Sequence, residues 1–320
     1  MDMKLIYNKI FLEHDTGMHP ENRKRLEALG DLPETQIENG EEYLRLFHDW
    51  HYIERVRRTC QNHDHLDAET VTCPNSYPAA VAAVAATVMA SRTGDFAVVR
   101  PPGHHAHPDR SSGFCIFNNV SIAAQRLVKE GKRVLIFDFD GHLGDGTEKF
   151  FYRTDRVMYW SLHQYPAFPG GGMPEQIGEN SGEGYTINLP LPAGSGDDIY
   201  LQAVKRFFPA ALQFKPDVVA VSAGFDAHQM DLLLELRLSF NAYYELGKIL
   251  SQNFKNIFAT LEGGYNIEIF PKCLYNFLAG INGEPQKFTE EPTDSKILVI
   301  EEYERAADIL EKKLSPHWRL

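Results

Sequence analysis

One stretch of the chain combines three groups that could hold a metal ion. Residues 134–138 read Val-Leu-Ile-Phe-Asp, and Asp140 and His142 follow at alternate positions. If the strand persists through residue 142, Asp138, Asp140 and His142 would share one face, because side chains two residues apart on an extended backbone point the same way. Carboxylates that end an apolar run need a compensating cation or donor, and a carboxylate beside an imidazole suits Zn²⁺ or a similar divalent ion. We therefore predict a metal site here.

A second apolar run supplies a third candidate ligand. Residues 217–223 lead into Gly-Phe-Asp226-Ala-His228. Asp226 would complete a set of two carboxylates and one imidazole, which leaves a coordination position open for water. Taken alone, each acid is typical of a helix N-cap or a turn. Their joint occurrence favours a catalytic metal.

Two further runs end in groups that a hydrolase could use. Residues 96–100 lead into Pro-Pro-Gly and the adjacent imidazoles of His104 and His105, which can carry protons near neutral pH. Residues 256–261 lead into Glu-Gly-Gly and the phenol of Tyr265, which could donate a hydrogen bond to an oxyanion. A surface turn or ordinary packing would explain either segment singly.

The segments that carry these groups alternate with amphipathic ones, as in βαβ units. The predicted strands cover residues 96–100, 134–138, 157–162, 218–223 and 256–261, and the predicted helices cover residues 78–92, 118–130, 199–213 and 239–253. Functional groups of open α/β sheets gather beyond the carboxyl ends of the strands, where all these sets fall. We predict an α/β fold with a mostly parallel sheet and helices on both faces.

The chain is expected to form a single domain, because no linker-like stretch divides its 320 residues. The predicted catalytic core covers about residues 14–283, and an extension of residues 284–320 packs on it. Within that extension, residues 296–300 are predicted to form a strand and residues 301–314 a helix.

Composition and charge exclude several classes of function. The net charge of −12 argues against general nucleic-acid binding and favours a cationic substrate. Four cysteines without framework spacing indicate reduced thiols, and the N-terminus has no signal-like apolar stretch. No apolar run is long enough to cross a bilayer. We expect a cytoplasmic protein that binds neither nucleic acid nor membrane; its oligomeric state stays open.

Together the motifs resemble those of the histone deacetylase and acetylpolyamine amidohydrolase superfamily. The chain has Arg-Pro-Pro-Gly-His-His-Ala at 100–106, Asp-x-Asp-x-His at 138–142, Ser-Ala-Gly-Phe-Asp-Ala-His at 222–228 and Leu-Glu-Gly-Gly-Tyr at 261–265, in the family's order. The resemblance runs from about residue 19 to about residue 281. It implies an arginase-like three-layer fold and a zinc-dependent amidohydrolase that removes acetyl or similar acyl groups from lysine or a related amine, with Fe²⁺ as the alternative metal.

The resemblance also implies a role for each motif residue. Asp140, His142 and Asp226 match the zinc ligands. His105 matches the main general base and acid, and His104 matches the histidine that tunes the electrostatics of the site.

Other positions match supporting groups. Asp145 matches the acid that orients the second histidine, and Tyr265 matches the donor to the oxyanion. Asp138 matches the partner of the first histidine and, with Ser161 and Leu162, a structural K⁺ or Na⁺ site. The positions that match the substrate channel and its surroundings are Gly113, Phe114, Phe168, Leu233 and Gly263.

The chain departs from the family pattern at two places. Leu143 replaces a second histidine that many members carry after the ligand, and residues 231–235 replace an Asp-Pro-Leu segment at the entrance. Leu143 alters the surroundings of the metal ligands, and the changed segment at the entrance affects substrate choice. Leu233 stands where some polyamine-selective members have a glutamate, which argues against that mode.

Two alternatives stay open from the sequence. Residues 136–141 also resemble the nucleophile motif of haloacid-dehalogenase-like phosphohydrolases, in which Asp138 would attack phosphorus with Mg²⁺ as cofactor. That reading leaves the tandem histidines unexplained. A catalytically inactive relative that binds acylated ligands is the other alternative, although no motif residue is missing.

Overall fold

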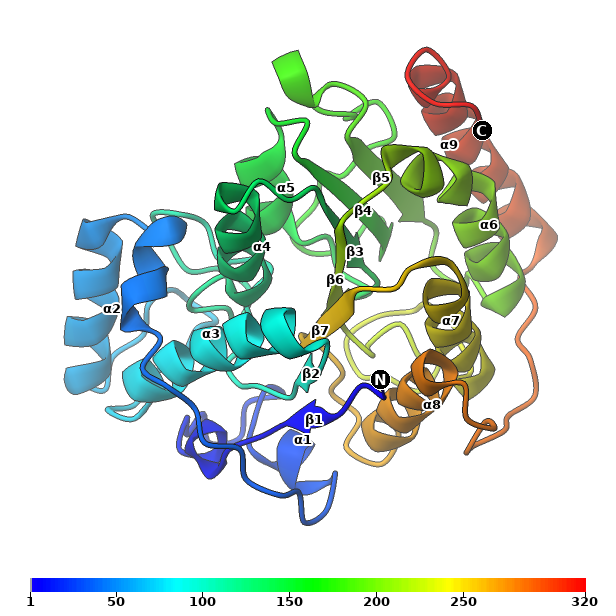
Figure 1. The fold of residues 1–320 in the computed structure, drawn as a ribbon. Helices are drawn as coiled ribbons and strands as arrows, with labels where there is room; N and C mark the ends of the chain where they lie inside the picture. Colours follow the sequence, from blue (N-terminus) through cyan, green and yellow to red (C-terminus); the bar gives the residue numbers. More distant parts are fainter. Residues whose placement is uncertain (1) are drawn as a thin grey trace.

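The computed structural model describes residues 2–320 and has a seven-stranded parallel sheet at its centre (Figure 1). The strands are β1 (Leu5–Ile6), β2 (Phe96–Ala97), β3 (Val134–Asp138), β4 (Val157–Gln164), β5 (Thr186–Leu191), β6 (Val218–Ala223) and β7 (Ile257–Leu261). They lie in the order β1-β2-β7-β6-β3-β4-β5, and every neighbouring pair is parallel. The strand with the densest motif, β3, therefore lies in the interior of the sheet.

Helices cover both faces of the sheet, which gives the predicted three layers. They are α1 (Lys24–Glu27), α2 (Trp50–Gln61), α3 (Ser76–Thr93), α4 (Asn119–Lys129), α5 (Asp145–Phe151), α6 (Asp197–Phe214), α7 (Phe240–Asn253), α8 (Phe270–Asn282) and α9 (Ile297–Leu314). Helices α3 and α4 pack on one side, and α6, α7 and α8 form the other side (Figure 1). The predicted α/β class is confirmed.

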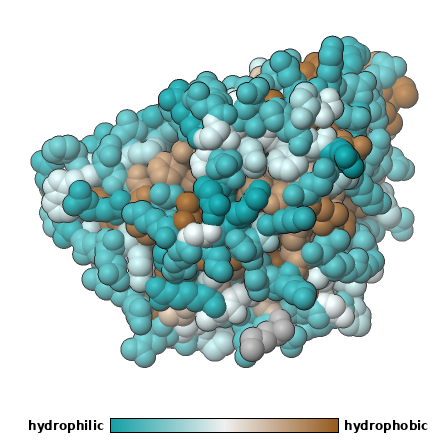
Figure 2. All heavy atoms as spheres, turned by 45° about the horizontal axis from the view of Figure 1, so that its top comes forward, coloured by the Kyte–Doolittle hydropathy of each residue, from teal (hydrophilic) through white to brown (hydrophobic). Residues whose placement is uncertain are grey.

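Burial explains why these segments adopt their structures. Every residue of β3, β4, β5 and β7 is buried, which is typical of strands in a parallel sheet covered on both faces. Helix α3 is rich in alanine and valine around most of its circumference, and most of its residues are buried. Hydrophilic groups cover most of the face shown in Figure 2, with apolar groups in patches between them.

The structure corrects one predicted element. Residues 296–300 were expected to form a strand, but residues from Ile297 onward belong to α9. The β-branched residues at the start of α9 favour a strand, but this preference covers only a short stretch of the segment. Buried side chains at Tyr303, Ala307, Leu310 and Leu314 recur every three or four residues, and this helical spacing determines how the whole segment packs.

The C-terminal extension covers the edge of the sheet. Helix α9 packs beside β5, and the indole Nε1 of Trp318 donates a hydrogen bond to the carbonyl oxygen of Gly184 at 2.6 Å. Arg206 of α6 forms ion pairs with carboxylates of Glu304, Asp308 and Glu311 on α9, at 2.8, 2.5 and 2.7 Å. These contacts support our proposal that the chain folds as one domain.

Deletion of residues 284–320 is expected to prevent stable folding. The deletion would expose the sheet edge at β5 and remove buried Tyr303, Leu310 and Leu314, and full burial of each leucine contributes roughly 1.5–3 kcal/mol. Circular dichroism and thermal unfolding of the truncated chain test this. A truncated protein that melts cooperatively at the temperature of the full chain would show that the extension is dispensable.

No helix among residues 2–320 is long and apolar enough to span a membrane. The four cysteines, Cys60, Cys73, Cys115 and Cys273, are all free thiols.

Candidate active site

The carboxyl ends of β3 and β6 bring the predicted metal ligands together. One ligand atom from each of Asp140, His142 and Asp226 lies within 4.8 Å of the other two, and all three residues are buried. The Nδ1 atom of His142 is 2.9 Å from Oδ2 of Asp226 and 3.3 Å from Oδ1 of Asp140. Two carboxylates and one imidazole therefore converge on one point.

The chemistry of this cluster fits a divalent cation. Burial disfavours a charged imidazole, yet Asp226 and Asp140 outweigh burial and raise the pKa of His142 to about 10. The two carboxylates therefore stabilise a positive charge at this point. A bound cation would supply that charge in place of the proton on His142. Glycines make room for it: a Cβ atom on Gly224 would lie 2.0 Å from Oδ2 of Asp140, and one on Gly263 would lie 2.4 Å from Oδ2 of Asp226.

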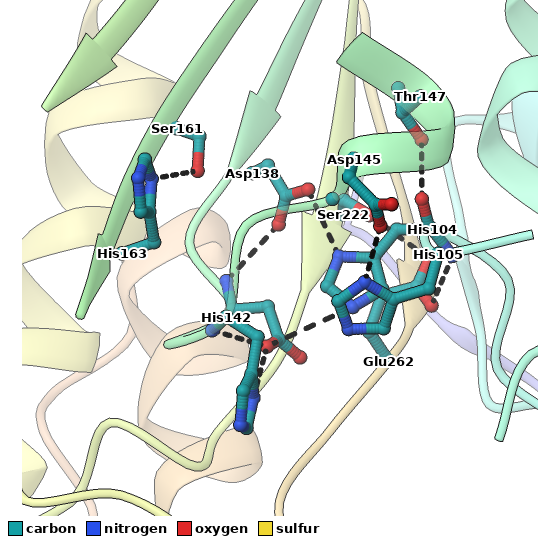
Figure 3. A network of polar contacts seen from close by, with 12 residues as sticks. His104, His105, Asp138, His142, Asp145, Thr147, Ser161, His163, Ser222 and Glu262 are labelled. Carbon is teal, nitrogen blue, oxygen red and sulfur yellow. Dashed lines mark hydrogen bonds and ion pairs between the residues drawn. The ribbon is translucent and has the colours of Figure 1, made fainter. Parts of the chain in front are cut away.

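The tandem histidines lie beside this cluster, and each has its own carboxylate (Figure 3). Nδ1 of His104 is 3.1 Å from Oδ2 of Asp138 at the end of β3. Nδ1 of His105 is 2.9 Å from Oδ1 of Asp145 at the start of α5. The two imidazole ring centroids are 4.0 Å apart.

The surroundings give the two imidazoles different charges. Burial opposes protonation of His104, but Asp140, Asp138 and Glu262 together raise its pKa well above the ordinary value. Burial, followed by the charge on His104, lowers the pKa of His105 to about 4. At neutral pH His105 is therefore free to accept a proton, while His104 carries positive charge.

The turn that carries the tandem histidines is held by Glu262, a group for which the sequence suggested no role. Its Oε2 accepts the backbone N–H groups of Gly103 and His104 at 2.7 and 3.1 Å, and its Oε1 accepts the hydroxyl of Ser222 at 2.9 Å. Burial raises the pKa of Glu262 to about 7. His104, Cys115 and Glu262 also lie close enough to share an ion, but three donors already engage this carboxylate.

Tyr265 is presented by the turn after β7. The guanidinium of Arg25 lies 5.0 Å from the centroid of its ring and donates hydrogen bonds to the carbonyl oxygens of Gly264 and Glu262 at 2.7 and 2.6 Å. Asp231 accepts the backbone N–H of Tyr265 at 2.7 Å. Burial raises the pKa of Tyr265 well above its ordinary value, so the phenol keeps its proton as a donor.

A cavity of about 210 Å³ connects these groups to the surface. It is lined by Glu69, His105, Gly113, Phe114, His142, Phe168, Leu233 and Tyr265. Of the predicted channel residues, Gly263 alone is outside this lining, because it packs under the ligand carboxylates. A larger hollow of about 580 Å³ lies at the amino end of β7, and no predicted site residue lines it.

Gly113 lets the channel walls approach each other. A Cβ atom there would lie 2.5 Å from Cδ2 of His105 and 2.8 Å from Cε1 of Phe168, and the backbone φ of 51° also favours glycine. The ring centroid of Phe168 is 5.1 Å from that of His105, and the ring centroid of Phe114 is 5.8 Å from that of Tyr265.

The residues expected to bind a monovalent cation lie on neighbouring strands. Asp138 of β3 pairs in register with Ser161 of β4, and Leu162 follows in the same strand. Oδ2 of Asp138 accepts the hydroxyl of Tyr159 at 3.0 Å, and Oγ of Ser161 is 3.0 Å from Nδ1 of His163. The structure therefore brings Asp138 and Ser161 together.

Two contacts of the site depend on residues that the motifs did not single out. Nε2 of His107 is 2.8 Å from Oδ2 of Asp145, so this carboxylate lies between two imidazoles. Glu21 is buried and accepts hydrogen bonds from Arg100 and Arg25, and it thereby links the tandem-histidine turn to the residue beside Tyr265. The run of residues 104–107 contained a signal for His107, and residues 19–21 resemble the family's opening loop, which gave Glu21 no specific role.

A buried histidine next to this site predicts sensitivity to acid. Burial lowers the pKa of His48 to about 3, and its Nε2 accepts the backbone N–H of Asn118 at 2.9 Å. The unfolded chain binds this proton near pH 6.5 and the folded chain does not, so the free energy of unfolding should fall as the pH drops below about 6.5, by up to about 1.4 kcal/mol per unit.

Urea unfolding at pH 7, 6 and 5 measures this slope. In His48→Gln the side-chain oxygen can still accept the Asn118 N–H, but the titrating group is gone, so a shallower slope is expected. Equal slopes in the variant and the natural protein would contradict the assignment.

A parallel α/β sheet with a buried carboxylate–imidazole cluster and a carboxylate-paired histidine at its carboxyl edge defines a metal-dependent hydrolase. Residues 19–281 match the histone deacetylase domain family. The chain therefore belongs to this family of deacetylases and amidohydrolases, and the family implies a divalent metal at the cluster. The phosphohydrolase alternative is set aside.

Similar proteins carry related names. The chain is 33% identical over 317 residues to a "probable deacetylase" of Archaeoglobus fulgidus, covering 90% of this chain and 88% of that protein. It is 34% identical to the "histone deacetylase-like amidohydrolase" of Pseudomonas aeruginosa, covering 79% and 73%. A rice relative named "histone deacetylase 10, chloroplastic" is 40% identical over 67% of this chain, which spans about half of that protein (51%).

A solved structure confirms the fold. The crystal structure of the HDA15 HD domain superposes with a TM-score of 0.89 at 28% sequence identity, covering 99% of this chain and 98% of that one.

Proposed function

We propose that this protein is a zinc-dependent deacetylase that hydrolyses acetyl or similar acyl amides of lysine or a related amine. The observation that carries the proposal is the position of neutral His105 beside the Asp140–His142–Asp226 cluster at the base of an aromatic channel. A neutral base, a cation site and a phenolic donor in one cavity are the parts that amide hydrolysis requires.

Zn²⁺ fits the donor set of Asp140, His142 and Asp226, and when bound it supplies Lewis acidity toward a carbonyl oxygen and toward water. His105 would take a proton from that water at Nε2, since its Nδ1 proton is engaged by Asp145. The water oxygen would bond to the amide carbon, and His105 would then give the proton to the amide nitrogen as the C–N bond breaks, which releases the amine and the carboxylate. His104, paired with Asp138, would tune the electrostatics of the site without transferring a proton.

Tyr265 would stabilise the negative charge that develops on the amide carbonyl oxygen when water adds to the carbon. Its phenol remains protonated, and the turn that carries it is fixed by Arg25 and Asp231. A donor held in place before the reaction requires no reorganisation as charge develops, which is the source of its catalytic effect.

The channel supports a narrow, largely aliphatic substrate segment. Phe114 and Phe168 form aromatic walls, and Gly113 keeps the passage close to His105. The acyl-lysine side chain and related acyl amines have this shape. Glu69 at the lining and the net charge of −12 favour substrates with nearby positive charge.

The proposal includes a structural K⁺ or Na⁺ bound by Asp138, Ser161 and Leu162, which is supported by the pairing of β3 and β4. It also includes a cytoplasmic location, which is supported by four free thiols. Both are separate from the hydrolytic proposal.

Purified protein assayed against acetyl-lysine peptides, acetylputrescine and longer acyl analogues tests the function, with elemental analysis of the same sample. We expect stoichiometric release of the free amine and the carboxylate from at least one acetyl-lysine substrate by zinc-loaded protein. A protein that holds zinc and cleaves none of these substrates would favour the inactive, ligand-binding alternative.

A further inference from the structure

The buried carboxylate of Glu21 binds the side chains of two arginines. Its Oε1 accepts a hydrogen bond from Nη1 of Arg25 at 3.1 Å, and its Oε2 accepts one from Nη2 of Arg100 at 2.8 Å. Nε of Arg100 also donates to Oε1. All three side chains are buried, and among residues 2–320 neither guanidinium group has another carboxylate as a partner. Loss of this one carboxylate would therefore leave two buried positive charges unpaired.

The two arginines hold the two turns that present catalytic groups. We call residues 100–105 the histidine turn and residues 262–265 the tyrosine turn. Arg100 is the first residue of the histidine turn, so its side chain fixes the position at which that turn begins. Arg25 donates hydrogen bonds to two carbonyl oxygens of the tyrosine turn, at 2.7 and 2.6 Å. Glu21 therefore connects the two turns through a pair of guanidinium groups.

A second contact joins the same two turns and closes the connection. The carboxylate of Glu262, at the start of the tyrosine turn, accepts two backbone N–H groups of the histidine turn at 2.7 and 3.1 Å. We call Glu21, Arg25, Arg100 and Glu262 the Glu21 network. Its contacts lead from Glu21 through one turn to the other and back to Glu21. A closed, buried network restricts the relative movement of the two turns more than either contact alone.

We propose that Glu21 is a positioning residue, which fixes the imidazole of His105 relative to the phenol of Tyr265 during amide hydrolysis. The inference rests on the proposed function. The imidazole and the phenol act on adjacent atoms in one step, because water bonds to the carbonyl carbon while charge develops on the carbonyl oxygen. Their relative placement therefore affects the rate. Glu21 belongs to neither the cavity lining nor the metal cluster, so it acts through the turns rather than on the substrate.

Glu21 depends on both its charge and its length to hold the network. Burial opposes ionisation, but Arg100, followed by Arg25, outweighs burial and lowers the pKa of Glu21 to about 2, so the carboxylate is ionised at neutral pH. Hydrogen bonds between ionised groups are shorter and stronger than those between neutral groups. Glu21→Gln keeps the length of the side chain and loses the charge. Glu21→Asp keeps the charge and is shorter by one methylene group.

Glu21→Asp is the principal test, because an aspartate still compensates the buried arginines but cannot reach both at the observed distances. With zinc-loaded protein and an acetyl-lysine peptide, we expect kcat per bound zinc to fall about tenfold, as a displacement of less than about 1 Å would give. KM should change less than about twofold, because the cavity lining is unaltered. Glu21→Gln should lower both kcat and the melting temperature further. An unchanged kcat per zinc in Glu21→Asp would overturn the inference.

The Tyr265→Phe background separates positioning from a general loss of stability. Where the oxyanion donor is absent, its placement no longer affects the rate, so Glu21→Asp should lower kcat/KM about threefold there instead of about tenfold. An equal fall in both backgrounds would assign Glu21 a merely structural role.

Asp197→Asn is the matched control for Glu21→Gln. The carboxylate of Asp197 is also buried, and it accepts the backbone N–H and the hydroxyl of Ser239 at 2.8 and 2.5 Å rather than any group of the two turns. We expect a lower melting temperature and an unchanged kcat per zinc. A fall in kcat as large as that of Glu21→Gln would show that loss of any buried carboxylate has this effect, and would overturn the inference.

Amide hydrogen exchange, followed by mass spectrometry, tests the network without turnover. In Glu21→Asp, exchange should become faster in both turns and stay unchanged in β5, which has no contact with Glu21. Unchanged exchange in the two turns would overturn the inference whether or not a substrate is found. Faster exchange in a protein whose natural, zinc-loaded form cleaves no acetyl amide would confirm the network and overturn the proposed function.

Discussion

His105→Ala and Tyr265→Phe are each expected to lower kcat/KM for acetyl-amide hydrolysis by about 10²–10⁴-fold in folded, metal-loaded protein. His105→Ala removes the one tandem imidazole that is neutral at pH 7, and His104 cannot replace it because Asp138 engages its Nδ1 and the charges of Asp140, Asp138 and Glu262 raise its pKa. Tyr265→Phe removes a donor from the oxyanion and leaves the ring that packs against Phe114. Steady-state kinetics with elemental analysis measures both effects.

The control for Tyr265→Phe is Tyr275→Phe. The phenol of Tyr275 also donates a hydrogen bond, to the carbonyl oxygen of Leu29 at 3.0 Å, but it does not line the channel. Its loss should leave kcat/KM near that of the natural protein. If Tyr265→Phe or His105→Ala retained natural activity, the role assigned to that residue would be wrong.

Asp140→Ala is expected to abolish stable zinc binding and with it all hydrolysis. The substitution leaves one carboxylate and one imidazole, and two ligands do not hold zinc against competition from water and buffer. Because the substitution also frees the backbone N–H groups of His142 and Gly263, which Asp140 accepts, circular dichroism should accompany the metal analysis to show that the variant is folded. Elemental analysis after gel filtration measures the bound metal.

Asp145→Asn is the matched comparison for Asp140→Ala. It alters a carboxylate of the same site that contacts His105 and His107 rather than the metal cluster. We expect it to keep zinc while losing activity. A metal-replete Asp140→Ala protein would remove Asp140 from the ligand set.

Much of the fold was predictable because its central strands are continuous apolar runs. Strand β5 was not predicted, because Pro190 interrupts its pattern, and proline is tolerated there since β5 pairs with β4 alone. Strands β1 and β2 have two residues each, too few for any periodicity to appear. The start of α9 was predicted as a strand from its local β-propensity. The segment is a helix because the packing of its whole length outweighs that propensity.

The site was predictable where its groups are contiguous in sequence. The Asp-x-Asp-x-His pattern places Asp140 and His142 two residues apart, and the backbone alone brings them together. The role of Glu21 was not predictable, because it arises from contact with Arg100, 79 positions later in the chain.

Metal titration coupled to catalysis tests the central claim most directly. Protein stripped of metal by a chelator is reconstituted with increasing Zn²⁺ while release of acetate from an acetyl-lysine peptide is followed. We expect no hydrolysis without metal and a linear rise that stops at about one Zn²⁺ per chain, as a single three-ligand site requires. Full activity in stripped protein, or no activity in protein that holds one zinc at this cluster, would contradict it.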